Sequence, residues 1–268
     1  MERSRMWSPL LIATLIAIGC GGGKPQEASA TPDAPEGRPV QVAEAPAGAQ
    51  PAVGGSSAVI QGTVTLDGQA PKPATLKMSA DPVCQQAHSS PVYAEDVVAS
   101  AQGQLKNVFV YVKDGVSGTY PAPATPVMLD QNGCVYKPHV FGIQVNQPLE
   151  VANSDPTAHN VNAKPTANTP FNTAQPSNKA PKVKKAFAKP EVMVKFKCNI
   201  HPWMSAYAGV VAHPFFGVSG DDGSFTISGL PAGTYTVEAW HEKYGTQTQS
   251  VTVGDGESES VNFTFKAQ

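Results

Sequence analysis

Short apolar runs of strand length, separated by glycine and proline turns, constrain the fold of this chain more than any other feature. Glycine (24 residues) and proline (25 residues) together supply about 18% of the chain, where roughly 12% is usual. Charged side chains make up only 15%, where about 25% is usual. Because helices need few breakers and a charged outer face, a mostly helical protein is disfavoured.

The apolar runs predict β-strands from residue 57 onward. They are rich in β-branched and aromatic residues and stop at turn signals such as Asp-Gly and Asn-Ser-Asp-Pro. The predicted strands lie at 59–66, 108–112, 140–145, 149–151, 192–196 and 208–212, with turn-and-strand stretches at 221–227 and 230–240 and strands at 249–253 and 261–265. Many short strands joined by turns predict an all-β protein made of antiparallel sandwiches.

The N-terminus has the pattern of a signal peptide, which we assign to residues 1–19. Arg3 and Arg5 precede a short apolar run, and small residues lead directly to Cys20. This resembles a bacterial lipobox, although Ala17 stands where Leu is commonest. It predicts acylation of Cys20 and an exported protein in the bacterial cell envelope, held to the membrane by lipid and facing the periplasm or cell surface. The alternative is ordinary cleavage with Cys20 incidental.

Residues 20–56 are predicted to be a disordered tether. More than half of them are Gly, Ala or Pro, and they include no aromatic residue. Such a segment cannot bury enough apolar surface to offset the entropy of ordering it. No apolar run reaches the roughly 18 residues of a membrane-spanning helix. The net charge of −2 disfavours a nucleic-acid partner, because domains that bind nucleic acid are usually strongly basic.

Metal-binding side chains gather in two stretches of the sequence. Cys198, His201 and Met204 lie within one seven-residue stretch, and His159 follows a loop upstream. Two imidazoles, one thiolate and a weak axial thioether are the ligand set of a blue-copper electron-transfer site. Thiolate suits Cu(I) and imidazole suits both oxidation states of copper. The ligands would therefore rearrange little when the copper ion gains or loses an electron. We find no nucleophile-and-base arrangement, and we expect no enzymatic activity.

These stretches resemble the cupredoxins, of the plastocyanin and amicyanin type, over roughly residues 105–212. The spacing around His201 is similar to that of the short amicyanin loop. The resemblance implies a Greek-key β-sandwich with one mononuclear copper ion bound by His159, Cys198, His201 and Met204. It also implies that Asn160 ties the two ligand loops together and that electrons pass through an exposed edge of His201. The matching residues are Asn153, Asp155, His159, Asn160, Val161, Cys198, His201 and Met204.

Cysteine arithmetic supports a free thiol at Cys198. With Cys20 acylated, an odd number of cysteines remains in an oxidising compartment. A disulfide between Cys84 and Cys134 would leave Cys198 for metal. The alternatives for Cys198 are a buried thiol or half of another disulfide in a sandwich that has lost its metal.

The C-terminal stretch has a second signature. Asp-Gly-Ser-Phe-x-Ile followed by Leu-Pro-Ala-Gly-Thr-Tyr, from Asp222 to Tyr235, resembles the carboxypeptidase regulatory-like, transthyretin-like sandwich family. We therefore expect a copper domain at 57–212 followed by a smaller sandwich at 213–268. In an alternative arrangement, a strand near 58–66 completes the smaller sandwich and the copper domain is inserted into it.

Other polar and aromatic residues carry weaker predictions. A surface or turn role is expected for His88, His139, His213 and His241. Trp203 and the pair Phe215-Phe216 are expected either in the core or in an apolar docking patch. Between residues 156 and 212 there are eight lysines and one acidic residue. This bias would steer an acidic partner, unless it is only a solvated loop.

Three functions remain open at this stage. The first is an envelope-anchored blue-copper protein that transfers single electrons between redox partners, such as a c-type cytochrome or a membrane oxidoreductase. The second is a copper-binding module that passes no electrons. The third is a metal-free β-sandwich lipoprotein that serves as an interaction scaffold.

Overall fold

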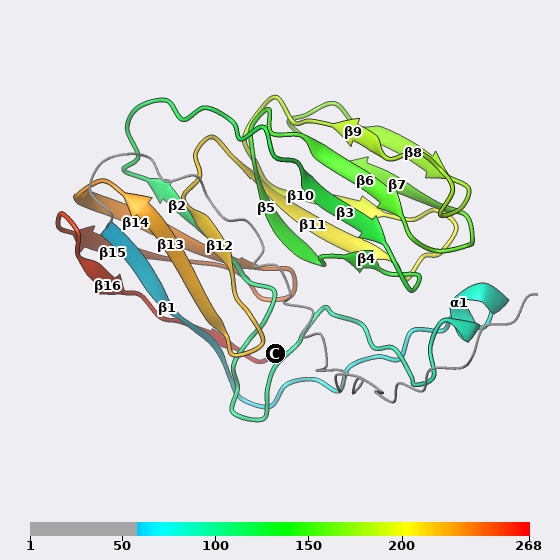
Figure 1. The fold of residues 1–268 in the computed structure, drawn as a ribbon. Helices are drawn as coiled ribbons and strands as arrows, with labels where there is room; N and C mark the ends of the chain where they lie inside the picture. The colour runs from blue at the N-terminus through cyan, green and yellow to red at the C-terminus, as the bar shows by residue number, and fades with distance from the viewer. Residues whose placement is uncertain (1–57) are drawn as a thin grey trace, which may run out of the picture. The chain divides into compact units, whose positions relative to one another are not determined.

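The computed structural model describes residues 58–268. The predicted signal peptide, Cys20 and the predicted tether lie outside the described residues. The described chain consists of strands β1–β17 and one five-residue helix, α1 (Pro82–Gln86), which confirms the all-β fold class (Figure 1). Within this range, no helix has the length and apolar character needed to cross a membrane.

The larger sandwich contains strands β3–β11. One sheet has the order β5-β11-β10-β7-β8, and the other has the order β4-β3-β6-β9. The strands of the first sheet are β5 (Val140–Gln144), β7 (His159–Lys164), β8 (Phe171–Gln175), β10 (Glu191–Lys197) and β11 (Ser205–Val211). Those of the second are β3 (Val127–Gln131), β4 (Tyr136–Lys137), β6 (Leu149–Asn153) and β9 (Val183–Lys185).

The smaller sandwich contains β1, β2 and β12–β17. One sheet has the order β13-β1-β16 with β17 also pairing with β1, and the other has the order β12-β2-β14-β15. The strands of the first sheet are β1 (Ala58–Asp67), β13 (Ser224–Leu230), β16 (Ser258–Ser260) and β17 (Phe263–Lys266). Those of the second are β2 (Phe109–Asp114), β12 (Phe216–Val218), β14 (Gly233–His241) and β15 (Gly245–Val253).

This pairing corrects the domain boundary expected from the sequence. Strand β1 pairs antiparallel with β13 and parallel with β16 and β17. Strand β2 pairs antiparallel with both β12 and β14. The range 57–212 expected for a copper domain is therefore too wide, because its first two strands belong to the smaller sandwich. Strands β3–β11 are inserted between β2 and β12.

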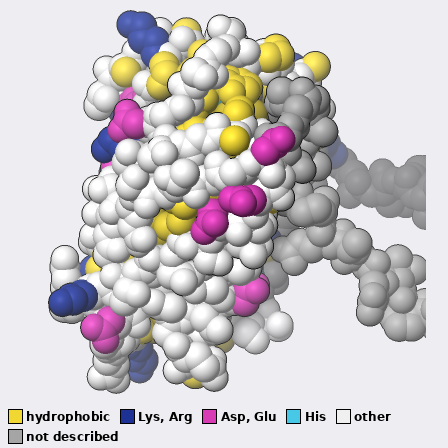
Figure 2. Space-filling view, turned by 90° about the vertical axis from the view of Figure 1, so that its left-hand side faces the viewer, with side chains coloured by type: hydrophobic (Ala, Val, Ile, Leu, Met, Phe, Trp, Pro, Cys, Tyr) yellow, Lys and Arg dark blue, Asp and Glu magenta, His cyan; other side chains and the backbone are white. Residues whose placement is uncertain are grey.

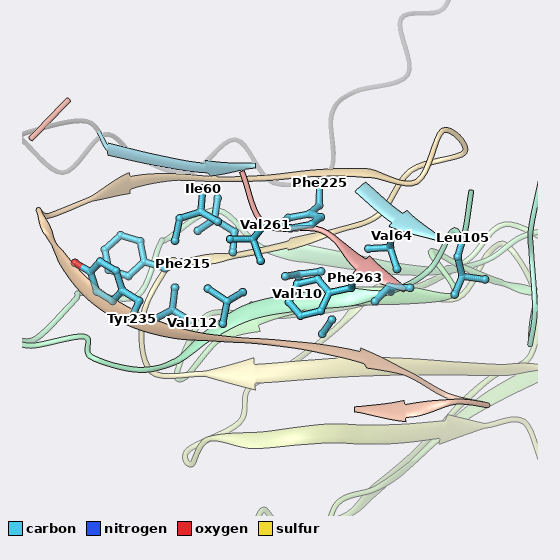
Figure 3. Close-up of a cluster of buried hydrophobic side chains, with 14 of the residues drawn as sticks. Ile60, Val64, Leu105, Val110, Val112, Phe215, Phe225, Tyr235, Val261 and Phe263 are labelled. Carbon is cyan, nitrogen blue, oxygen red and sulfur yellow. The ribbon is translucent and has the colours of Figure 1, made fainter. Parts of the chain in front are cut away.

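Each sandwich has its own apolar core. In the smaller one, side chains from both sheets meet in a buried cluster that includes Ile60, Val110, Phe225 and Phe263 (Figure 3). In the larger one, the buried cluster includes Leu129, Val151 and Phe196, and it extends to Cys198 and Met204. The alternation of apolar and polar residues along β13 and β17 sets which face is buried.

The two sandwiches touch through a close approach of backbone and ring. Phe109 of β2 is fully buried and packs with Val140, Tyr207 and Val211 of the larger sandwich. A Cβ atom at Gly209 would lie 2.2 Å from the Phe109 ring. Glycine is therefore required at this position, because any side chain would push the ring out of the contact.

Two histidines expected at the surface are buried. His139 and His241 are 7% and 1% exposed. His139 Nε2 bonds to Glu242, and its Nδ1 lies 3.1 Å from the Ser205 carbonyl oxygen. Burial lowers the pKa of His139, but the Glu242 carboxylate outweighs this and raises the pKa above its ordinary value. Sequence spacing gave no sign of this pair, because its members are 103 residues apart.

Residues 74–94, which we call the covering segment, lie between β1 and β2 in the chain. Backbone hydrogen bonds close the segment at its ends, from Ala94 N–H to the Ala74 oxygen and from Leu76 N–H to the Val92 oxygen. It carries α1, and a disulfide joins Cys84 of α1 to Cys134 of the larger sandwich. This bond fixes the covering segment against the larger sandwich.

Candidate metal centre

The four predicted ligands come from one end of a single sheet. His159 is the first residue of β7, and Cys198 directly follows β10. His201 and Met204 lie on the turn that leads into β11. Strand β10 pairs with both β7 and β11, so the sheet holds the two ligand stretches side by side. All four side chains are buried, with at most 4% exposure.

Three donor atoms converge at this end of the sheet. His159 Nδ1 lies 2.8 Å from His201 Nδ1, and Cys198 Sγ lies 4.0 Å from His201 Nδ1. One donor atom from each of His159, Cys198 and His201 lies within 4.8 Å of the others. Both imidazoles turn the same nitrogen, Nδ1, toward one point, which is the arrangement that a shared metal ion requires.

Backbone hydrogen bonds shape the turn that carries three of the predicted ligands. The His201 N–H donates to Cys198 Sγ at 3.3 Å, and the Met204 N–H donates to the His201 oxygen at 3.0 Å. The Cys198 N–H closes the turn on the Met204 oxygen at 3.3 Å. Met204 is therefore brought to the buried side of the turn, in the same apolar cluster as Cys198.

Asn160 lies between the two ligand stretches, as the resemblance implied. Its Oδ1 accepts a hydrogen bond from the Asn199 N–H at 2.8 Å and lies 3.5 Å from Cys198 Sγ. Asn160 itself is next to His159 in the chain. One amide side chain thus links the strand that begins with the first histidine to the turn that contains the cysteine.

A carboxylate contacts the Nε2 atom of each imidazole, the ring nitrogen that does not face the other ligands. His159 Nε2 lies 3.0 Å from Asp155 Oδ2, and His201 Nε2 lies 3.0 Å from Asp81 Oδ2. In the neutral form of each ring, an Nε2–H that donates to the carboxylate leaves on Nδ1 the lone pair that a metal needs. Asp155 is itself fixed, because it accepts hydrogen bonds from the N–H groups of Gly133 and Cys134.

The charges of the cluster favour a thiolate. Burial raises the pKa of Cys198, but a hydrogen bond with His159 and backbone N–H groups outweigh it and lower the pKa below its ordinary value. Burial likewise lowers the pKa of His159, but hydrogen bonds with Asp155 and Cys198 raise it to about 9. For His201, burial is the largest effect and lowers the pKa. The thiolate is the form that binds metal.

The donor set fits copper. One thiolate, two imidazoles and a buried thioether on the same turn match the His₂Cys plus axial Met set of blue-copper sites. A structural zinc site would instead carry four strong ligands. Cys198 is the free cysteine of the described residues, and it is buried. Cys84 and Cys134 are joined to each other and so are not available as ligands.

His201 differs from expectation in its exposure. The resemblance implied an exposed imidazole edge, but the His201 side chain is only 3% exposed. Asp81 of the covering segment occupies its outer side, and Cys84 Sγ lies 3.8 Å from its Nε2. An exposed edge of His201 is therefore not available for direct contact with a partner.

The outer surface beside His201 is a hollow of about 610 Å³. It is lined by Lys77, Ala80, Asp81, Ile200, His201, Pro202 and Trp203. The Trp203 ring centroid lies 4.9 Å from that of His201, and its Nε1–H donates to the Cys134 oxygen. Trp203 thus lies beside the site, whereas Phe215 is in the smaller core and Phe216 packs against Phe109.

Sequence reasoning missed the carboxylate at Asp81. The residue pair Asp81-Pro82 is a helix-start signal, because Asp caps helices and Pro favours the first turn. That signal could have located α1. It could not have placed Asp81 against His201, since the two residues are 120 positions apart.

A comparison with protein-family models agrees with one of the two resemblances in the sequence. Residues 210–266 match the model of the carboxypeptidase regulatory-like domain, which confirms the recognition of the C-terminal stretch. No curated protein sequence matches the chain.

Among solved structures, similar ones are cupredoxins and a copper enzyme. A Cu(I) amicyanin variant is 14% identical, with a TM-score of 0.29 over 32% of this chain and 81% of that one. A purple cupredoxin from Nitrosopumilus maritimus is 20% identical, with a TM-score of 0.26 over 32% of this chain and 97% of that one. A copper-containing nitrite reductase from Thermus scotoductus is 23% identical, with a TM-score of 0.30 over 37% of this chain. The match spans only 25% of that reductase. The chain thus combines a carboxypeptidase regulatory-like segment with a likeness to cupredoxin structures.

Proposed function

We propose that the larger sandwich is a type 1 copper protein that transfers single electrons between redox partners. The observation that carries this proposal is the convergence of the Cys198 thiol and the Nδ1 atoms of His159 and His201 at one buried point. The set is neither a catalytic triad nor a closed zinc site. When bound, copper would supply a one-electron couple between Cu(II) and Cu(I).

The protein residues would keep that site rigid and dry. Cys198, His159 and His201 would be the strong ligands, and Met204 would be the weak axial one. Asn160, Asp155 and Asp81 fix the ligand side chains through hydrogen bonds. Because the ligands are held in place before metal binds, little rearrangement would accompany the gain or loss of an electron.

The hollow beside Trp203 is the proposed place of electron exchange. Trp203 is partly exposed, lines the hollow together with His201, and has its ring centroid 4.9 Å from that of His201. Since the imidazole itself is covered, a partner would approach through this hollow.

Charge supports a partner with an acidic surface, such as a c-type cytochrome or a membrane oxidoreductase. Lys164 of β7 and Lys195 of β10 lie directly opposite each other, and like charges in such a pair cost stability. A basic surface that includes these two lysines would speed the encounter with an acidic protein. The smaller sandwich contrasts with this, because residues 213–268 include seven acidic residues and two lysines. Figure 2 shows acidic side chains near the middle of the face on the β15 and β16 side.

The visible spectrum of the copper-loaded protein tests the proposal. We expect one copper ion per chain and an intense thiolate-to-copper band that disappears on reduction and returns on oxidation. Spectra are recorded with copper, with zinc and without metal, and the zinc-loaded protein should be colourless. Failure to bind copper would contradict an electron carrier and favour a metal-free scaffold, whereas a copper complex with no charge-transfer band would contradict an electron carrier and favour a module that only holds copper.

The burial of His201 favours a second candidate, a module that holds copper without passing electrons. The covering segment shields the ligand that would otherwise exchange electrons with a partner. Stopped-flow mixing of the reduced protein with an oxidised c-type cytochrome separates the candidates. A carrier should react within the dead time or in milliseconds, whereas a holding module should keep Cu(I) for many minutes.

We also propose that the protein is anchored to the bacterial envelope through acylated Cys20. The support is the charged and apolar leader followed by small residues and cysteine. We expect the mature protein to sediment with membranes and Cys20→Ala to move to the soluble fraction. Cell fractionation with an antibody measures this, and Ser56→Ala serves as a control that leaves the lipobox intact. Equal membrane association of both variants would contradict lipidation.

A further inference from the structure

We propose that Asp81 of the covering segment is a positioning residue that sets the tautomer of His201 and lowers the reduction potential of the bound metal. This inference rests on the proposed copper function and adds a residue from outside the larger sandwich. Asp81 Oδ2 lies 3.0 Å from His201 Nε2. The carboxylate therefore holds the proton on Nε2 and leaves Nδ1 free to face Cys198 and His159.

The position of Asp81 is fixed by several independent contacts. Its Oδ1 accepts hydrogen bonds from the N–H groups of Val83 and Cys84 at 2.8 and 3.3 Å, which caps the start of α1. Its Oδ2 also accepts a hydrogen bond from the Thr157 hydroxyl at 3.0 Å. Both oxygens are thus engaged, and the second one is directed at His201.

The disulfide connects the two carboxylates behind the imidazoles. Cys84 is bonded to Cys134, and the Cys134 N–H donates to Asp155 Oδ2 at 2.8 Å. Asp155 bonds to His159 as Asp81 bonds to His201. One covalent link therefore holds both carboxylate–imidazole pairs in a common frame.

The chemical consequence follows from charge. A carboxylate that accepts the Nε2–H bond makes the imidazole a stronger donor. A stronger donor stabilises Cu(II) more than Cu(I), because the more highly charged ion gains more from added electron density. Asp81 would therefore favour the oxidised state and lower the reduction potential.

The test uses two substitutions that preserve the helix cap. Asn and Ser are both good capping residues, but neither presents a carboxylate to His201. We expect Asp81→Asn and Asp81→Ser to bind copper with the charge-transfer band retained. Removal of a partner of a metal-bound histidine typically weakens metal binding about 10- to 100-fold. We expect about a tenfold loss of Cu(II) affinity relative to Cu(I), which equals a rise of about 59 mV in potential for one electron.

Two controls separate a local effect from a general one. Thr157→Val removes the other side-chain hydrogen bond to Asp81 Oδ2 but keeps the carboxylate, so any rise in its potential should be much smaller than that of Asp81→Asn. Asp222→Asn removes an equal charge from an exposed turn of the smaller sandwich, and it should leave the potential unchanged. A comparable rise in either control would overturn the proposed role of the Asp81 carboxylate.

A measurement without copper makes the inference independent of redox activity. Long-range ¹H–¹⁵N spectra of the metal-free protein should show His201 with its proton on Nε2 in the wild type and a mixture of tautomers in Asp81→Asn. If copper gives no blue band in the wild type, the proposed function fails, yet the tautomer result still decides the role of Asp81. If the band is present and both the potential and the tautomer are unchanged in Asp81→Asn, this inference is wrong while the proposed function stands.

Discussion

Replacing Cys198 with serine is expected to abolish the charge-transfer band and the redox activity while the β-sandwiches remain folded. A neutral hydroxyl cannot replace the thiolate, which supplies both the strongest bond to copper and the band itself. The two side chains have similar shapes, and Cys198 is only one of the many buried residues of the apolar cluster in the larger sandwich. We therefore expect a complete loss of colour with only a small change in the free energy of unfolding.

Visible absorption and far-ultraviolet circular dichroism of the same sample check this result. Lys197→Ser is the matched control, because it changes the neighbouring residue, whose side chain is exposed, and leaves every ligand intact. The control should remain blue. A Cys198→Ser protein that retains the band would show that the ligand assignment is wrong.

Removing the disulfide is expected to have the second largest effect. Cys84 and Cys134 are 50 residues apart in the chain. On the chain-entropy model, closing a loop of about 50 residues is worth roughly 4 kcal/mol. We expect the free energy of unfolding of the double variant Cys84→Ala, Cys134→Ala to be lower than that of the wild type by an amount of this order. Copper affinity should also fall, because the bond holds the covering segment that carries Asp81.

Denaturant titration of the metal-free protein measures the first effect, and competition with a copper chelator measures the second. Alanine at both positions avoids an unpaired thiol that would compete with Cys198 for metal. The single variant Cys84→Ala, which leaves Cys134 as a free thiol beside Asp155, shows how much of the change comes from such a thiol. A double variant as stable as the wild type would contradict the entropic account.

Much of the fold could be predicted from local sequence. Strands such as β10 and β14 combine β-branched residues with clear turn signals, and the structure has strands at both places. Strands β8 and β9 escaped prediction because they are short or mostly polar and half-exposed. Their pairing comes from neighbouring strands rather than from their own composition.

The long-range parts of the structure could not be predicted. The ligand residues share two short stretches, so their chemistry is visible in the sequence. By contrast, Asp81 reaches His201 through a tertiary contact, and His139 meets Glu242 across the two sandwiches. No local pattern encodes such contacts, because they depend on how distant segments pack.

The pairing of β1 with β17 has a consequence for the order in which the protein folds. The Thr63 N–H donates to Asn262 Oδ1 across 199 residues of chain, so the first described strand finds its partner only when the last has been made. Strands β3–β11 form a contiguous stretch of the chain, so they can pair with one another before the C-terminal strands have been made. Strands β2 and β12, which lead into and out of that stretch, pair with each other, so a folded insert brings the flanking segments together and shortens the loop that must close. We therefore expect the larger sandwich to fold first and the smaller sandwich to be completed around it.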